Sequence, residues 1–260
     1  MSLEDLSLYA VLGAYASFAL VEWWKPARPL EPTKHWRAKG VFFFILYLAV
    51  STALPFLWDA ALAEYRLFDL THLSLGWATA IGVVALELGV YAWHRLMHNT
   101  PVLWRWFHQM HHSAERMDVW GAMYFHPLDM AGFSFVGSLA LVWGFGVTPE
   151  AALIANTLVF FLAVFQHTNV RTPHWLGYFI VRPEMHGVHH GRGIHAYNYC
   201  DLPAIDWLLG TYRNPVAWDG PYGFYSGASS RIKDMLIGRD ISSGKPATLG
   251  ANSPDVAPAE

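Results

Sequence analysis

Cysteine and charge are the two features that this 260-residue sequence has least of. Its single cysteine, Cys200, excludes an intrachain disulfide framework and an all-thiolate metal site, so any metal must rest on nitrogen and oxygen ligands. Charged residues make up 14% of the chain, whereas an average soluble domain contains about 25%. The basic residues are scattered rather than massed, and we expect no nucleic-acid partner. So low a charge content predicts a surface that faces lipid.

Motifs for nucleotide binding and serine hydrolysis are missing as well. The chain contains no G-x-x-x-x-G-K-[ST] and no G-x-S-x-G sequence, and it shows no repeat at a fixed period. What it has instead is a hydrophobic content of 54% and 14 histidines.

Long apolar runs predict membrane-spanning helices. Residues 6–24 contain one charged side chain, Glu22, and are long enough to cross a hydrocarbon core of about 30 Å. Further apolar runs follow at 40–58, 75–93, 130–147 and 150–165. The last two are separated only by the helix-breaking residues 146–149, which predicts an antiparallel hairpin. We expect an all-α integral membrane protein, a bundle of about four to five membrane helices.

The distribution of lysine and arginine predicts which ends of these helices share a side. The segment 25–39 is rich in basic residues and proline, whereas the loop 59–69 is mostly acidic, so the positive-inside rule places the first in the cytoplasm and the second opposite. The third span brings the chain back to the basic side, and the hairpin leaves and returns there. This topology predicts a cytoplasmic, histidine-rich helical cap on a multi-pass protein.

Histidines gather beside these runs at spacings typical of metal ligands. Residues i, i+3 and i+4 share a helix face, so each cluster can aim its imidazoles at one point. One HxxxH and two HxxHH clusters are present: His94 and His98; His108, His111 and His112; His186, His189 and His190. Eight imidazoles exceed the four ligands of a closed zinc site, which predicts two metal ions. The isolated His35, His72 and His174 are expected to be exposed or hydrogen-bonded instead.

The order of these boxes resembles that of the fatty acid hydroxylase and sterol desaturase superfamily of membrane di-iron enzymes. The flanking residues 104–108, 112–113, 126–128, 198–199, 206, 210–212 and 214–215 are similar to that family's, over about residues 80–216. The resemblance implies two non-haem iron ions and O₂, which hydroxylate or desaturate an unactivated C–H bond of a lipid, sterol-like or fatty acyl. The chain has no flavin, haem or iron–sulfur motif, so electrons would come from an external donor, cytochrome b5-like or ferredoxin-type.

The chain departs from the family's pattern at three positions. Cys200 and Ile205 stand where glycine and tryptophan are usual, and Asp129 stands where glutamate is frequent. Because all the histidine boxes are intact, these departures bear on the substrate more than on the chemistry. The family's pattern of additional ligands, together with its place at the end of the hairpin, makes His167 the expected ninth ligand.

Several roles stay open from the sequence alone. His126 and His195 are either ligands or supports of ligands, and Glu87 is left out of the site because a hydrogen-bonded carboxyl explains it as well. The polar partners that orient the imidazoles are unranked among four candidates: Asp118, Asp129, Asn169 and Asp201. Residues 202–209 form either an amphipathic helix against the membrane or a buried segment.

The organisation predicted is one membrane-embedded domain over residues 1–240, followed by a disordered tail at 241–260 that is rich in Ser, Gly, Pro and Ala. Two other classes compete with an oxygenase. A histidine-rich metal-binding or metal-transport protein would need polar residues along its spans. A zinc-dependent membrane hydrolase would need the glutamate of H-E-x-x-H, which the HxxHH boxes lack.

Overall fold

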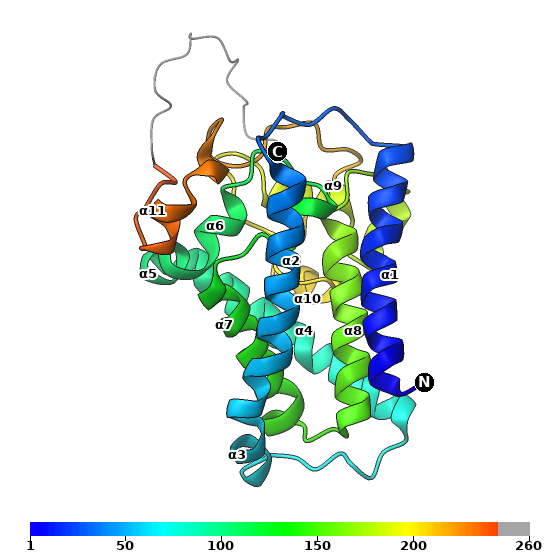
Figure 1. Ribbon diagram of the computed structural model, residues 1–260. Helices are drawn as coiled ribbons and strands as arrows, with labels where there is room; N and C mark the ends of the chain where they lie inside the picture. Colours follow the sequence, from blue (N-terminus) through cyan, green and yellow to red (C-terminus); the bar gives the residue numbers. More distant parts are fainter. Residues whose placement is uncertain (244–260) are drawn as a thin grey trace.

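Five long helices form the body of the molecule (Figure 1). The computed structural model describes residues 1–243, and this part is helical throughout apart from turns and loops. The long helices are α1 (Leu3–Trp24), α2 (Trp36–Ala53, extended by η1, Leu54–Leu57), α4 (Leu75–Asn99), α7 (Pro127–Ser138, extended by η4, Leu139–Gly144) and α8 (Pro149–Gln166). Each is long and apolar enough to cross a membrane. The all-α class and the upper count of predicted spans are confirmed.

The helix ends follow local sequence signals. Ser2 caps α1 through a reciprocal pair of hydrogen bonds with Asp5, and Pro127 and Pro149 open α7 and α8 at the position where a missing N–H does no harm. The predicted turn at 146–149 reverses the chain, with Gly146 in the left-handed conformation. Helix α4 packs against both arms of this hairpin, α7 and α8.

Helix α4 continues six residues beyond the predicted end of the third span, to Asn99. No helix breaker occurs before Thr100, which precedes Pro101 and is extended for that reason. His94 and His98 therefore lie on the last two turns of a membrane-length helix rather than in a loop behind it. Helix α2 likewise begins at Trp36, four residues before the predicted boundary.

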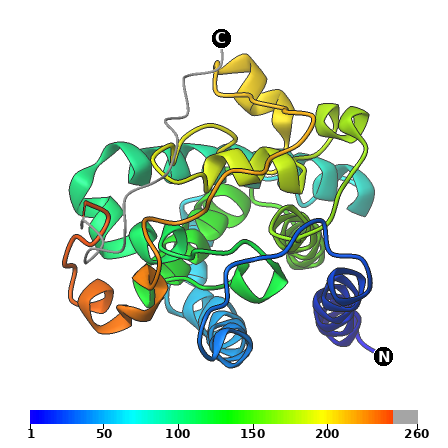
Figure 2. The same ribbon diagram turned by 90° about the horizontal axis from the view of Figure 1, so that it is seen from above.

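Short helical segments cover one end of the bundle (Figure 2). They are α5 (Pro101–Leu103), η2 (Trp104–His108), α6 (Gln109–His112), η3 (Val119–Gly121), η5 (His174–Tyr178), α9 (Pro183–His189), α10 (Pro203–Leu208), η6 (Ala228–Ser230) and α11 (Ile232–Leu236). The basic segment 25–39 is tied to this cap, because Ala27 N–H donates to Asn169 O at 2.7 Å and the Arg28 guanidinium donates to Gly220 O at 2.8 Å. The short helix α3 (Asp59–Glu64) lies at the opposite end (Figure 1).

Helix α10 presents apolar side chains outward. Trp207 and Leu208 are 69% and 74% exposed, whereas Ile205 and Asp206 are buried. An exposed apolar face favours the amphipathic interpretation of residues 202–209 over a buried segment. The predicted tail lies outside the described residues from 244 onward, and Ile241 at its start is buried under the cap.

Candidate metal centre

The cap and the end of α4 bring nine buried or partly buried histidines together in two groups. The first group is His94, His98, His108, His112 and His189. The second group is His111, His167, His186 and His190. Within each group, one potential ligand atom per residue lies within 4.8 Å of all the others. The structure therefore brings all nine predicted residues together, including His167 at the C-terminal end of α8.

Each HxxHH box is divided between the two groups, which corrects the expectation that a box aims at one point. The i and i+4 histidines go to one group and the i+3 histidine goes to the other. Each residue advances about 100° around a helix. Relative to residue i, the i+4 side chain is therefore rotated by about 40° in one direction and the i+3 side chain by about 60° in the opposite direction. In η2 and α6 the pair His108 and His112 belongs to the first group, and in α9 the pair His186 and His190 belongs to the second.

Hydrogen bonds on the far side of the rings fix the tautomers of the first group. His94 Nδ1 lies 2.7 Å from Tyr199 O, and His189 Nδ1 lies 2.6 Å from Tyr197 O. A carbonyl oxygen only accepts, so in both rings the proton is on Nδ1 and Nε2 carries a bare lone pair. Yet His94 Nε2 lies 3.0 Å from His189 Nε2 and 2.8 Å from His108 Nε2.

In the second group the tautomer of one ring, His167, is fixed in the same way. His167 Nδ1 donates to Ala163 O at 2.6 Å, one helical turn back, which leaves Nε2 as a lone pair. This atom is 3.0 Å from His111 Nε2 and 3.1 Å from His186 Nε2, and His190 Nε2 is 3.0 Å from His186 Nε2.

Facing lone pairs repel unless a cation lies between them. Two nitrogens bound at right angles to one ion, each about 2.1 Å away, would be about 3.0 Å apart. The observed separations of 2.8 to 3.1 Å match that spacing. Buried Nε2 atoms of His98 and His112 also have no hydrogen-bond partner among the described residues. The residues present therefore fit two metal ions.

Asp129 is the one predicted polar partner that contacts a box histidine. Its Oδ2 accepts from His108 Nδ1 at 2.6 Å, and the carboxyl is fully buried with its second oxygen unpartnered in the described chain. An isolated buried carboxylate is costly, so a cation on the other side of His108 would balance it.

The other three predicted partners hold the scaffold instead. Asp118 accepts from Trp36 Nε1, Asn169 donates to Arg28 O, and the Asp201 backbone N–H donates to Glu87 Oε2. Glu87 thus ties α4 to the loop before α10, which agrees with its exclusion from the site.

The two histidines whose roles were open take different positions. His126 caps α7 by accepting from Leu128 N–H and belongs to neither group. His195 is outside both groups, with its Nδ1 3.2 Å from His112 Nδ1. Of the isolated histidines, His35 and His72 are exposed and His174 Nε2 donates to Asn214 O, as expected.

Burial sets the protonation of the cap histidines. It lowers the pKa of His108, His111, His112, His186, His189 and His190 well below the usual value, and neighbouring imidazoles lower it further. Burial lowers the pKa of His167 to about 4. These rings are neutral at neutral pH, which is the form that binds metal.

The contacts to the histidines that could not be predicted from the sequence are made by backbone groups. The carbonyl of Tyr197 orients His189, and the carbonyl of Tyr199 orients His94. The direction of these carbonyls depends on left-handed backbone, with φ of 72° at Tyr197 and 47° at Asn198. Asparagine tolerates this conformation, but nothing in the sequence marks Tyr197 for it.

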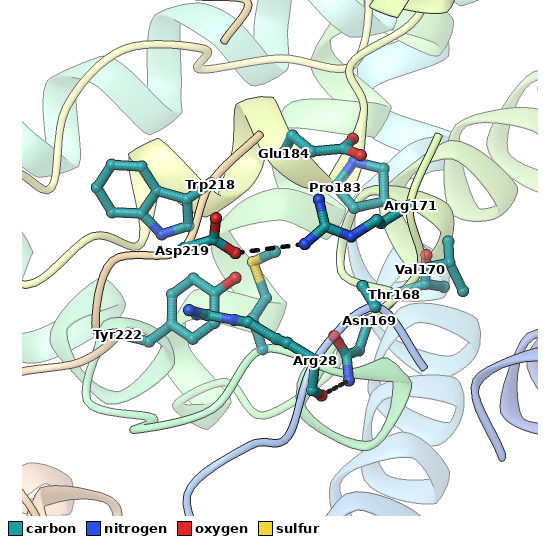
Figure 3. Close-up of a pocket in the computed structure, with 12 residues that line it drawn as sticks. Arg28, Thr168, Asn169, Val170, Arg171, Pro183, Glu184, Trp218, Asp219 and Tyr222 are labelled. Carbon is teal, nitrogen blue, oxygen red and sulfur yellow. Dashed lines mark hydrogen bonds and ion pairs between the residues drawn. The ribbon is translucent and has the colours of Figure 1, made fainter. Parts of the chain in front are cut away.

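A small pocket with a mixed polar and apolar lining opens on the cap beside the second group (Figure 3). Its volume is about 20 Å³, room for a water molecule rather than a lipid. Thr168, next to His167, and Glu184, two residues before His186, lie in its wall. The Arg28 guanidinium stacks 4.4 Å over the Tyr222 ring at its rim.

Fold and site together define a membrane-embedded helical protein with a two-part histidine centre suited to metal. The chain belongs to the fatty acid hydroxylase family, whose model matches residues 79–211, about half of the sequence. It is 31% identical to the ornithine lipid hydroxylase OlsE of Rhizobium tropici over 60% of this chain and 47% of that protein.

Two further relatives belong to plants. Identity is 27% with a Delta(7)-sterol-C5(6)-desaturase of Nicotiana tabacum, over 59% of this chain and 56% of the relative. Identity is 24% with sphinganine C4-monooxygenase 1 of Arabidopsis thaliana, over 59% of this chain and 60% of that relative. The chain thus spans about half the length of these curated relatives. The search of solved structures returned no significant match.

Proposed function

We propose that this protein is an O₂-dependent di-iron oxidoreductase that hydroxylates or desaturates an unactivated C–H bond of a lipid. Hydroxylation would consume the C–H bond, one O₂, two electrons and two protons, and would yield C–OH and water. Desaturation would take up the same O₂, electrons and protons, remove two hydrogens from the lipid and release two waters. In both cases the electrons come from an external carrier, cytochrome b5-like or ferredoxin-type.

The observation that carries this proposal is the set of opposed imidazole Nε2 atoms, 2.8 to 3.1 Å apart, in two groups. The first group offers five imidazoles, one more than a closed tetrahedral zinc site accepts. Imidazole suits iron, and an ion with positions beyond its protein ligands can react. We propose all nine histidines as ligands: His94, His98, His108, His112 and His189 for one ion, and His111, His167, His186 and His190 for the other.

The chain's own residues would orient the imidazoles and exclude water from the site. When bound, the iron ions supply the activation of O₂ and of the C–H bond. His94 and His189 keep their protons on Nδ1 through carbonyl contacts, so their Nε2 atoms stay available for metal. The burial of the group ligands keeps bulk water from the reacting atoms.

Lipid is the proposed substrate class because of the family and of the position of the site. The relatives above are named for action on an ornithine lipid, a sterol and sphinganine, and this chain places its histidines where membrane-length helices end. A lipid can approach from the bilayer while the electron carrier approaches the cap from water. We place the cap in the cytoplasm because the basic segment 25–39 is attached to it, and we treat residues 1–240 as one domain.

A histidine-rich metal transporter is the alternative, and the far half of the bundle weighs against it. A path for ions needs polar groups along the spans. The groove between the first half of α4 and α8 is lined instead by Leu75, Gly76, Thr79, Ala80, Val83, Ile154 and Leu158, which are almost all apolar. The buried Glu22 of α1 accepts two backbone N–H groups of the cap and so has a structural role.

The test is metal analysis of the full chain purified in detergent or nanodiscs, joined to lipid analysis. We expect about two iron ions per chain, because two groups of ligands are present. With a chemical reductant and oxygen-18 gas, lipids of an expression host should gain one labelled oxygen or lose two hydrogens. A single ion per chain, or full activity with zinc alone, contradicts the proposal.

A further inference from the structure

The two histidine groups are supported unequally on the far side of their rings. In the first group, Nδ1 of His94, His108 and His189 each faces an acceptor at 2.6 to 2.7 Å: two backbone carbonyls and the Asp129 carboxylate. In the second group, His167 alone has such an acceptor among residues 1–243, Ala163 O of its own helix. His186 Nδ1 is buried with no partner in the described chain, and His111 Nδ1 has the Tyr124 backbone nearby without hydrogen-bond geometry.

The two carbonyl acceptors of the first group, Tyr197 O and Tyr199 O, come from one loop that is itself fixed. Tyr199 N–H donates to Asp206 Oδ1 at 2.9 Å while Tyr199 C=O accepts from His94. The same Asp206 oxygen accepts from Thr211 Oγ1 at 2.7 Å. The Asn198 side chain donates to Met185 O and to Arg213 O at 2.9 Å each. These bonds hold a left-handed turn that would relax without them.

Outer hydrogen bonds of this kind orient a ligating imidazole and raise its basicity, and losing one costs about 10–100-fold in metal affinity. The first group also gains the negative charge of a buried carboxylate, which attracts a cation across His108. The second group has neither the loop nor a carboxylate on its rings in the described part of the chain.

Resting on the function proposed above, we propose that the two metal positions differ in affinity. The first group binds its ion first and releases it last, and Asp129 and Asp206 are the positioning residues that set this order. The second group holds the exchangeable ion. Asp206 acts at a distance, through the Tyr199 peptide unit and His94, and touches no metal.

Stepwise removal of iron tests the order. The full chain, loaded anaerobically with Fe²⁺, is equilibrated with buffers of falling free Fe²⁺, and the iron retained per chain is measured. We expect a plateau near one ion, with the two losses separated by at least about 10-fold in free Fe²⁺. Loss of both ions in one step overturns the proposal while leaving the di-iron function intact, whereas a chain that binds no metal defeats the proposed function instead.

Crossed variants identify which group keeps its ion. With the second group broken by His186→Ala, adding Asp129→Asn or Asp206→Ala should weaken the remaining ion about 10–100-fold. With the first group broken by His98→Ala, Asp206→Ala should leave the remaining ion unchanged. Equal weakening in both backgrounds would reveal a general structural role and contradict the proposal.

Two controls separate positioning from misfolding. Asp206→Asn retains an oxygen that accepts from Tyr199 N–H, so it should restore most of the affinity that Asp206→Ala loses. Asp118→Ala removes another buried carboxylate that accepts a backbone N–H, from Gly121, but supports no histidine, so it should keep the plateau. Failure of Asp206→Asn to restore binding, or loss of the plateau in Asp118→Ala, would count against the loop as the cause.

Discussion

At the scale of single residues, each group is built from imidazoles whose Nε2 atoms face one another. We predict that His111→Ala and His189→Ala each lower the metal content towards one ion per chain and reduce turnover by more than about 100-fold, since even an outer partner costs about 10–100-fold. His111 belongs to the second group and His189 to the first. Iron analysis and a lipid oxidation assay on the same preparations measure both effects.

His72→Ala is the control for this comparison. His72 is exposed and outside both groups, so its replacement should change stability by no more than about 0.5 kcal/mol and leave the iron content at two. His35 is less suitable, because its φ of 55° would place alanine in a strained conformation. Wild-type iron and activity in the His111 and His189 variants would exclude the di-iron interpretation.

The histidines that gather in the two groups could be predicted from the sequence, whereas of their partners Asp129 was only one of four unranked candidates and the backbone carbonyls were not foreseen. Spacing marks the histidines because i, i+3 and i+4 positions share a helix face. Predicting how each box divides between the two groups requires the direction of each side chain in the folded protein. Residue spacing alone does not give that direction. Asp129 lies 21 residues after His108, and Tyr199 lies 105 residues after His94, so only the folded chain shows these pairs.

At the scale of helices, the crossing of α2 and η3 depends on a glycine. A Cβ at Gly40 would meet Trp120 O and would lie 2.9 Å from Trp120 Cβ, and backbone of this kind cannot move aside cheaply. We predict that Gly40→Ala lowers the free energy of unfolding by about 1–3 kcal/mol, as overpacking does. Thermal or denaturant unfolding in detergent measures the change.

Gly13→Ala is the matched control, because Gly13 lies inside α1 and a Cβ there meets nothing within 4 Å. Alanine favours a helix over glycine by up to about 1 kcal/mol, so this variant should be neutral or more stable. If Gly40→Ala were as stable as Gly13→Ala, the close approach of α2 to Trp120 would be wrong.

The apolar runs were sufficient to predict that the membrane-length helices exist, but they did not give the residues at which these helices end. The run 75–93 ends where polar residues begin, yet α4 continues to Asn99 because the histidines and Arg95 are compatible with a helix. The irregular loop 195–199 escaped prediction for a different reason. Its left-handed residues include His195 and Tyr197, which sequence rules do not assign to that conformation, and tertiary hydrogen bonds hold them there.

At the scale of the whole molecule, charge is distributed along the bundle axis. The cap end carries the basic segment 25–39 and Arg192, whereas the opposite end carries Asp59, Glu64 and Asp69 with Arg66. Such a bias orients membrane proteins with the basic end in the cytoplasm. The hydrogen bonds between the 25–39 segment and the cap make the side of the segment also the side of the histidines.

We therefore predict that single cysteines at Lys34 and Arg192 are both labelled by a membrane-impermeant maleimide only after the cytoplasmic side is opened. A cysteine at Glu64, beyond the far end of α2, should be labelled in intact cells. The unsubstituted protein is the baseline, because Cys200 is 3% exposed and should react little. Labelling of Lys34→Cys and Arg192→Cys from opposite sides would separate the basic segment from the histidines and contradict the fold. Labelling of both from outside would preserve the fold but reverse the orientation, and electrons would then have to reach the site from the other face of the membrane.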